Sequence, residues 1–308
     1  MDVVRSTGRS LLIIVLLFLF LGLPLQAYSL KIGLAITEGV FILGGAIFFA
    51  HRFYREEWQE ALRLRGPGFR GFFTGLAVGV AGWLVATTVE AVIIHFATRL
   101  GWHLPPQGLP YPRSTGEVLE LFLLVSLGAG VAEELLFRGL VLRGYERLGP
   151  GRGVLISALL FSLMHGSFLK LVPVLILGTV YALLALRFNS VYPSMLAHAT
   201  NNALSLTVLL LQPYFISLPA TTEHILGLAV LIVVPAGFAL LWTMAKRLLV
   251  FVKQGEDEVF SLADTTLGLE FWLVVVLLLV LVALEVFSLL GWEFSVRDFI
   301  RALFWRTG

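Results

Sequence analysis

Two adjacent glutamates lie inside a hydrophobic run of this sequence, and they are its strongest candidates for chemistry. Glu133 and Glu134 occur in the stretch Val-Ala-Glu-Glu-Leu-Leu-Phe-Arg, which ends at Arg138. A carboxylate at membrane depth costs about 2.5–3.5 kcal/mol, so it is rarely kept without a partner or a function. On a helix, Glu134 and Arg138 are i,i+4 neighbours with the acid first, an order that favours a salt bridge. Glu133 points about 100° away around the helix and has no such partner, which suits a general base.

The composition indicates a membrane protein. Of the 308 residues, 58% are hydrophobic and only 14% are charged, and the charges cluster between long apolar runs. Only helices and closed barrels satisfy all backbone polar groups in lipid, and these runs lack the alternation of barrel strands. A net charge of +2 gives no indication of nucleic-acid binding. The absence of cysteine excludes thiol catalysis, disulfides and cysteine-ligated metals.

The fold class that follows is all-α, a polytopic transmembrane bundle of eight or nine helices in a single membrane domain, residues 1–308. The first two apolar runs and the fifth are short for a full crossing, which leaves the number at eight or nine. The nine runs cover residues 11–27, 32–50, 72–98, 118–142, 154–168, 171–188, 192–211, 225–249 and 269–290.

The first run has two interpretations. Its basic start and short apolar core are compatible with a secretory signal. An uncleaved first helix is favoured, because no convincing small-x-small cleavage site follows and a second apolar run begins directly after Lys31.

Basic residues predict the orientation. They concentrate in alternate loops, and the positive-inside rule makes that side cytoplasmic, together with the N-terminus. Short loops and compact size favour a prokaryotic cell membrane. The residues that carry this prediction are Arg52, Arg55, Arg63, Arg65, Arg70, Arg143, Arg147, Arg152, Arg187, Lys246, Arg247 and Lys253, whereas Arg297, Arg301 and Arg306 depart from it.

Three more polar residues interrupt apolar runs. His165 ends the stretch Phe-Ser-Leu-Met-His, and His198 and Asn202 are i,i+4 neighbours on a later helix. Counted from the nearest cytoplasmic loops, Glu133, His165 and His198 lie roughly 13–18 Å below the helix ends. Polar groups at one depth on three helices can converge on one site, which we expect to open toward the cytoplasm.

Taken together, these motifs resemble those of the CAAX-processing intramembrane glutamic protease family, which comprises the type II CAAX prenyl endopeptidases and their bacterial relatives. The first motif alone is modestly specific, but all three on consecutive hydrophobic segments are strongly so. The resemblance covers about residues 117–212. Its motifs are Glu133-Glu134-x-x-x-Arg138, Phe161-x-x-x-His165 and His198-x-x-x-Asn202.

The resemblance implies a mechanism. Glu133 and His165 would hold and deprotonate a water molecule that attacks a peptide carbonyl. His198 and Asn202 would donate hydrogen bonds to the developing oxyanion, which is worth roughly 3–4 kcal/mol per well-placed donor. No metal or other cofactor is required.

The same resemblance assigns supporting roles and partners. Glu134 and Arg138 would brace the helix and orient Glu133. The expected partners are membrane lipid and a peptide or lipidated-protein substrate, including C-terminal tails of lipidated proteins, and no nucleic acid.

Other functions fit parts of the pattern. Two histidines and a carboxylate could bind zinc in a membrane hydrolase, although no His-Glu-x-x-His motif occurs. A non-catalytic chaperone, scaffold or immunity protein could retain the motifs, and a transporter could use buried polar groups, but no inverted repeat is evident. Four further polar residues in or near apolar runs are interpreted as interhelical or water-facing contacts: Glu38, Glu90, His95 and Glu285.

Overall fold

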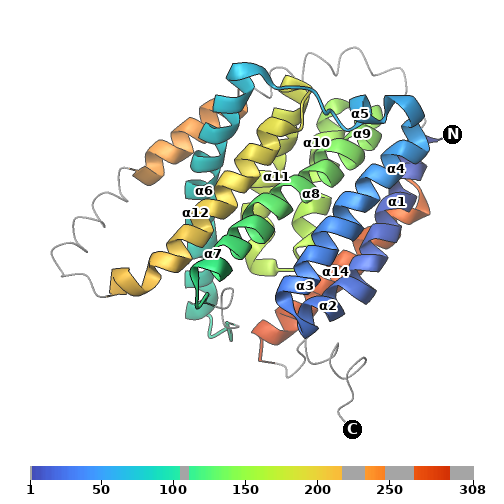
Figure 1. Cartoon of the computed structure of the whole chain (residues 1–308). Coiled ribbons are helices and arrows are strands. Elements are labelled where there is room, and N and C mark those ends of the chain that lie inside the picture. Colours follow the sequence, from blue (N-terminus) through green and yellow to red (C-terminus); the bar gives the residue numbers. More distant parts are fainter. Residues whose placement is uncertain (1, 105–110, 217–232, 247–266, 292–308) are drawn as a thin grey trace, which may run out of the picture.

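The computed structural model describes residues 2–104, 111–216, 233–246 and 267–291 (Figure 1). Within these ranges the chain forms nine helices and no strand, which confirms the all-α fold. Five of them are long and apolar enough to cross a membrane: Val3–Tyr28, Leu30–Ala61, Gly68–Arg99, Phe168–Phe188 and Leu269–Leu289. The predicted run 225–249 is described only for the helix Val233–Lys246, and its remaining residues lie outside the described part.

Three of the helices contain wider, π-helical turns. The first helix consists of α1 (Val3–Leu17), a π-helical turn (Phe18–Gly22) and α2 (Leu23–Tyr28). The second consists of α3 (Leu30–Ile36), a π-helical segment (Thr37–Gly44), α4 (Gly45–Tyr54), a 3-10 turn (Arg55–Glu57) and α5 (Trp58–Ala61). The fourth consists of α7 (Thr115–Leu121), a π-helical segment (Phe122–Gly128), α8 (Ala129–Glu134), a second π-helical segment (Leu135–Val141), α9 (Leu142–Tyr145) and a 3-10 turn (Glu146–Leu148).

The remaining helices are regular. They are α6 (Gly68–Arg99), α10 (Pro150–Met164), α11 (Phe168–Phe188), α12 (Tyr192–Ile216), the helix Val233–Lys246 and α14 (Leu269–Leu289).

The helices pack as neighbouring pairs around α8. In Figure 1, α12 lies beside α6 on one side of the bundle, while α1, α4 and α14 lie on the other. The second helix runs along the fourth, α10 packs against α11, and α12 packs against both α6 and α8. Small residues permit these close approaches: a Cβ on Gly75 of α6 would lie 2.5 Å from the carbonyl oxygen of Pro193.

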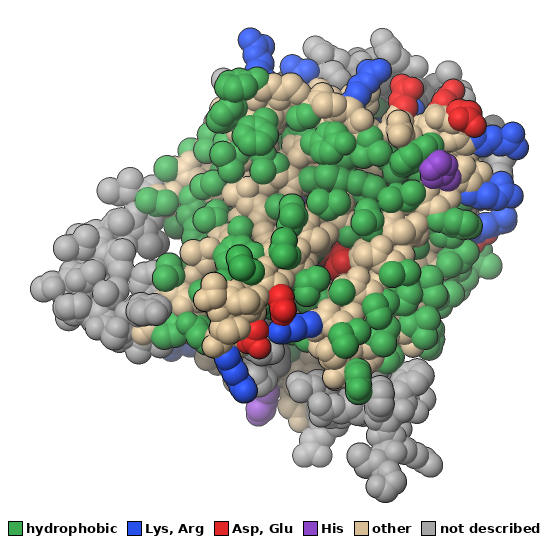
Figure 2. Space-filling view, viewed as in Figure 1, with side chains coloured by type: hydrophobic (Ala, Val, Ile, Leu, Met, Phe, Trp, Pro, Cys, Tyr) green, Lys and Arg blue, Asp and Glu red, His purple; other side chains and the backbone are tan. Residues whose placement is uncertain are grey.

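Side chains on the outer surface match a lipid environment. Figure 2 shows hydrophobic side chains over most of the middle of one face, with Lys and Arg gathered along the upper edge and a smaller charged group below. Large apolar side chains such as Phe20, Phe48 and Leu123 are more than half exposed. In water such a surface would drive association, whereas hydrocarbon tails cover it without cost.

One buried arginine joins three loops at the same end of the bundle. The backbone of Arg63 accepts a hydrogen bond from Val191 N over 3.1 Å, and its guanidinium donates to the carbonyl of Arg138 over 3.0 Å and pairs with Glu146. The loops that follow the second, fourth and sixth helices therefore share one end, as alternating crossings require. That this end faces the cytoplasm stays a prediction from the sequence.

The fifth helix ends earlier than the run 154–168 predicts. It stops at Met164, because Gly166 adopts a left-handed conformation with φ +61° and Ser167 is extended. The next helix begins at Phe168. His165 consequently lies at the C-terminal end of α10, beside a turn, rather than inside a continuous helix.

Candidate functional site

A buried ionic cluster joins two of the three motifs. Nη1 of Arg138 donates to Oε1 of Glu134 over 2.8 Å, as the i,i+4 spacing predicts. The same carboxylate oxygen lies 3.0 Å from Nδ1 of His198 on α12. Glu134 and Arg138 are completely buried and His198 is 4% exposed, so this bonding operates without competition from water. Glu134 thus fixes His198 as well as Arg138, which the sequence did not indicate.

The second amino group of Arg138 extends the cluster to α11. Nη2 donates to the carbonyl oxygen of Gly178 over 3.1 Å. A Cβ on Gly178 would lie 3.1–3.3 Å from Phe161 and Ala158, so glycine lets α11 come close enough to α10 to present this carbonyl.

Phe161, the first residue of the second motif, contacts all of these groups. Its ring centroid lies 4.2 Å from the Arg138 guanidinium carbon, 4.9 Å from the His165 ring and 5.7 Å from the His198 ring. Tyr181 of α11 stacks on the His198 ring, with the ring centroids 5.7 Å apart. Cation–π and edge-to-face contacts of this kind hold the ring planes in one orientation. The three motif helices therefore meet around one phenylalanine.

Hydrogen bonds to Nδ1 define which nitrogen each imidazole offers to a ligand. His165 Nδ1 lies 2.9 Å from the carbonyl oxygen of Phe161, and a carbonyl can only accept, so this nitrogen carries the hydrogen. Glu134 imposes the same arrangement on His198. In the neutral rings Nε2 is then the free acceptor, and only a protonated imidazole donates through it.

The turn that carries His165 is held from α14. Ser167 Oγ donates to Oε1 of Glu285 over 2.7 Å, and the backbone N–H of Phe168 donates to the other carboxylate oxygen. Glu285 therefore caps the start of α11, where unpaired N–H groups favour an anionic partner. The His165 side chain itself is exposed on the protein surface.

Asn202 lies one helical turn beyond His198 and faces the fourth helix. Its Nδ2 donates to the carbonyl oxygen of Val125 over 3.0 Å, and its Oδ1 accepts from Asn201 Nδ2 over 3.1 Å. Nearby, a Cβ on Gly130 would lie 3.1 Å from the backbone nitrogen of Ala199. The small residue before the glutamates thus brings α12 against α8. One N–H of the Asn202 amide remains available to a ligand.

Glu133 stands apart from this network. Its side chain is half-buried, and its Oε2 is inaccessible to solvent and has no hydrogen-bond partner. Within the part of the chain that the structure describes, no hydrogen bond or ion pair joins Glu133 to His165 or His198. Its charge interacts with those of His198, Glu134 and Arg138 over longer distances. The structure joins Glu134, Arg138, Phe161, His165 and His198 by direct contacts. Asn202 contacts Val125 instead, and Glu133 has no hydrogen bond in the described part of the chain.

The segment that carries all three motifs matches a known family. Residues 115–204 match the family model described as type II CAAX prenyl endopeptidase Rce1-like. By this similarity it is named the Rce1-like segment. The match supports the resemblance drawn from the motifs and lies close to the predicted range 117–212. No curated protein and no solved structure matches the chain.

Two residues near the site received no role in the sequence analysis. Tyr181 belongs to the Rce1-like segment but sits among apolar residues and carries no spacing signal. Glu38 lies outside that segment, on the second helix, and was noticed only as an acid in an apolar run. Its charge also interacts with that of Glu133.

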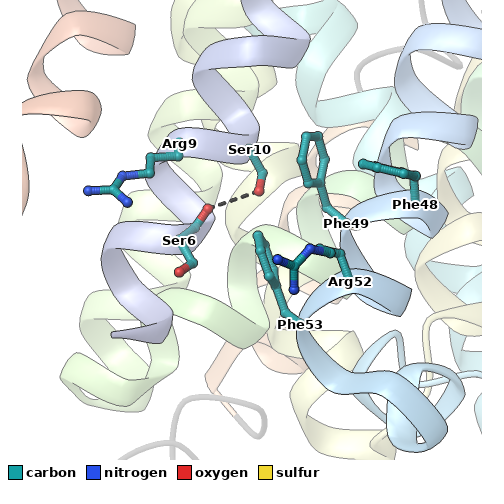
Figure 3. A pocket seen from close by; sticks show the side chains of 7 residues that line it. All are labelled: Ser6, Arg9, Ser10, Phe48, Phe49, Arg52 and Phe53. Atoms are coloured by element: carbon teal, nitrogen blue, oxygen red, sulfur yellow. Dashed lines mark hydrogen bonds between the residues drawn. The ribbon is translucent and has the colours of Figure 1, made fainter. Parts of the chain in front are cut away.

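A pocket of about 260 Å³ lies elsewhere, between α1 and α4 (Figure 3). Its lining contains no residue of the three motifs: it consists of Ser6, Arg9, Ser10, Phe48, Phe49, Arg52 and Phe53. Arg9 points away from the phenylalanines in Figure 3, and its Nε binds Oε1 of Glu270 at 2.7 Å. This pocket is separate from the candidate site of the Rce1-like segment.

Metal ligation was the other chemistry compatible with the motif residues. Among the described residues, no three His, Asp or Glu side chains are grouped so that they could hold a metal ion. Glu134, the carboxylate nearest His198, already accepts a hydrogen bond from Arg138.

Proposed function

We propose that the protein is an intramembrane endopeptidase that hydrolyses a peptide bond with a glutamate- and histidine-activated water molecule. The observation that carries this proposal is the meeting of the three motif helices around Phe161, within the segment that matches the prenyl endopeptidase model. The match implies peptidase chemistry, and the contacts supply oriented groups for it.

In the first chemical step, Glu133 acts as the base and His165 orients the water molecule. The free carboxylate of Glu133 takes one proton from water while the water oxygen attacks the scissile carbonyl carbon. Nε2 of His165 accepts a hydrogen bond from the second water hydrogen, because Phe161 holds its Nδ1 as the donor. The proton on Glu133 then passes to the leaving amine as the tetrahedral intermediate collapses, so the base ends the cycle ionised.

The oxyanion of that intermediate needs donors. The available N–H of Asn202 is one, and protonated His198 donates through Nε2 as the other. Glu134 supports the second donor, because its carboxylate accepts from Nδ1 and stabilises the imidazolium as the acid of a catalytic triad does. Glu134 and Arg138 are supporting residues in this scheme.

The substrate class proposed is a peptide at the membrane, including C-terminal tails of lipidated proteins, and the setting proposed is a prokaryotic cell membrane. The Arg63 end of the bundle faces the cytoplasm in this proposal, since the basic loops that predict orientation adjoin it.

The proposal is tested by measuring cleavage of fluorogenic peptides, with and without a C-terminal prenyl group, by the purified protein in lipid nanodiscs. The wild type should cleave at least one of them, whereas Glu133→Gln and His165→Ala should lower kcat by about 10²–10⁴-fold. Glu90→Gln, the same chemical change in α6, is the matched control and should retain full activity. Equal rates in wild type and Glu133→Gln would refute the proposal.

A zinc-dependent hydrolase gives a different result in the same assay. Metal analysis of the active protein, followed by chelation, distinguishes the two mechanisms. If the active protein contains stoichiometric zinc and a chelator abolishes turnover, the attacking water is activated by the metal and not by Glu133.

A further inference from the structure

The two adjacent glutamates of the first motif face different helices. Glu134 points inward to Arg138 and α12. Glu133 projects about 100° further around the helix, and α8 packs against the π-helical segment Thr37–Gly44. The partner of Glu133 should therefore be sought on the second helix, outside the segment that matches the family model.

Glu38 is the acidic residue of that π-helical segment. Thr37, just before it, is completely buried against the first helix, where its Oγ1 accepts from Gln26 Nε2 over 3.2 Å. Glu38, the next residue, projects from the helix in a different direction from Thr37. π-helical segments of this kind are frequent at functional sites, because they realign a side chain within a helix.

The carboxyls of Glu38 and Glu133 are both incompletely hydrogen-bonded. Each has an Oε2 atom that is inaccessible to solvent and has no hydrogen-bond partner, and their charges interact. Two carboxylates that interact in a poorly solvated site cannot easily both be ionised, and the usual solution is one proton shared by the pair. The protonated member then gains an O–H donor for the ionised one.

We propose that Glu38 is a positioning residue of the candidate active site: it holds the shared proton and donates its O–H to the Glu133 carboxylate. This inference rests on the proposed function, in which Glu133 is the base. The hydrogen bond fixes the orientation of an otherwise unattached carboxylate while leaving its second oxygen for water. Charged groups that act on Glu133 from the surrounding helices are Glu38, His198, Glu134 and Arg138.

Arg138 is bonded to other groups than Glu133. Its two amino groups are used by Glu134 and by the carbonyl of Gly178. Its remaining Nε is buried and has no partner, and it lies on a side chain that Phe161 covers at 4.2 Å. Glu38 is a candidate for the missing donor because no hydrogen bond from Arg138 to Glu133 is present in the described part of the chain.

The pH dependence of kcat/KM tests this role with Glu38→Gln and Glu38→Ala, and with Glu90→Gln as the matched control. The Gln amide keeps an N–H donor at every pH, so Glu38→Gln should remain active and its alkaline limb should move to higher pH by about one unit. Glu38→Ala loses the donor at every pH, and its kcat should fall about tenfold even at the optimum. Profiles of both variants that coincide with those of wild type and Glu90→Gln would overturn the proposal.

Infrared spectroscopy of the purified protein gives a second readout that needs no substrate. At neutral pH the wild type should show a protonated-carboxyl band that is lost in Glu38→Gln and in Glu133→Gln but kept in Glu90→Gln. A band that survives in both site variants would overturn the carboxyl pair.

The two readouts separate this inference from the proposed function. If the infrared band is lost in both Glu38→Gln and Glu133→Gln but Glu133→Gln hydrolyses peptides as fast as the wild type, the carboxyl pair is supported and the protease is refuted. If Glu133→Gln abolishes hydrolysis but substitution of Glu38 changes neither the infrared band nor the pH profile, the protease is supported and the carboxyl pair is refuted.

Discussion

Replacement of Arg138 by methionine tests whether the buried cluster is as tightly coupled as its geometry indicates. Methionine fills a similar volume and keeps an unbranched side chain under Phe161. It removes the 2.8 Å bond to Glu134 and the 3.1 Å bond to Gly178, and it leaves a completely buried carboxylate opposite an apolar group.

The expected loss of stability is large. Removing one partner of a buried ion pair typically costs 3–5 kcal/mol, because the other charge stays uncompensated. We therefore expect Arg138→Met to lower the free energy of unfolding by about 3–5 kcal/mol.

A second substitution, Glu134→Gln, tests the coupling by whether it lowers or raises the stability of the protein. In the wild type, Glu134→Gln should destabilise the protein, because the Arg138 charge loses its counter-charge. In the Arg138→Met background the same substitution should stabilise it, because it neutralises the stranded carboxylate. Such a reversal measures the coupling between the two side chains without reference to any other contact.

Reversible unfolding of the detergent-solubilised protein by SDS, followed by circular dichroism, measures all four proteins of this cycle. Arg143→Met is the matched control: Nη1 of Arg143 pairs with Glu146 at the same distance of 2.8 Å, but the arginine side chain is 31% exposed. Its loss should cost less than about 1 kcal/mol. If Glu134→Gln destabilises both backgrounds equally, the cluster is not held as described.

Three further predictions concern the contacts around the cluster. Asn202→Ala should lower kcat by about 10²–10³-fold, because it removes an oxyanion donor; an unchanged kcat in the peptide assay would contradict that role. Gly130→Val should cost about 1–3 kcal/mol in SDS unfolding, since its Cβ would lie 3.1–3.3 Å from Ala199; Ala199→Gly should recover part of this loss, and no recovery would place the clash elsewhere. Glu285→Ala removes the cap of α11 and should cost about 1–2 kcal/mol in the same measurement, and a stability equal to wild type would show that the cap contributes nothing.

Helix positions were predictable from the sequence because hydropathy and loop charge act locally along the chain. The runs 72–98, 192–211 and 269–290 match α6, α12 and α14 to within a few residues at most ends. The Glu134–Arg138 bond was predictable for the same reason, since i,i+4 neighbours on one helix need no tertiary information. The end of α10 was not, because the apolar run continues through Phe168 while the backbone turns at Gly166.

Contacts between helices were the part of the structure that sequence patterns predicted least. Equal depth predicted that His165 and His198 would approach each other, and Phe161 lies between them. Nothing in the spacing indicated that Glu134 would bind His198, because that bond depends on the close approach of α12 at Gly130. Rotation of one helix about its axis decides such contacts, and hydropathy does not encode it when a helix is apolar on most sides.

The same reasoning explains why a family pattern cannot complete this site. A pattern confined to residues 115–204 describes the fourth to seventh helices, and within them Oε1 of Glu134 has two partners. Glu133, which has no hydrogen bond in the described part of the chain, lies on α8, and α8 packs against the second helix, about ninety residues earlier in the chain. A buried carboxyl without a hydrogen bond is costly, so whatever satisfies it must come from that helix or from a bound molecule. The acidic side chain that the second helix offers there is therefore best understood as part of the site, and the cost of burying Glu38 is offset by what it does for Glu133.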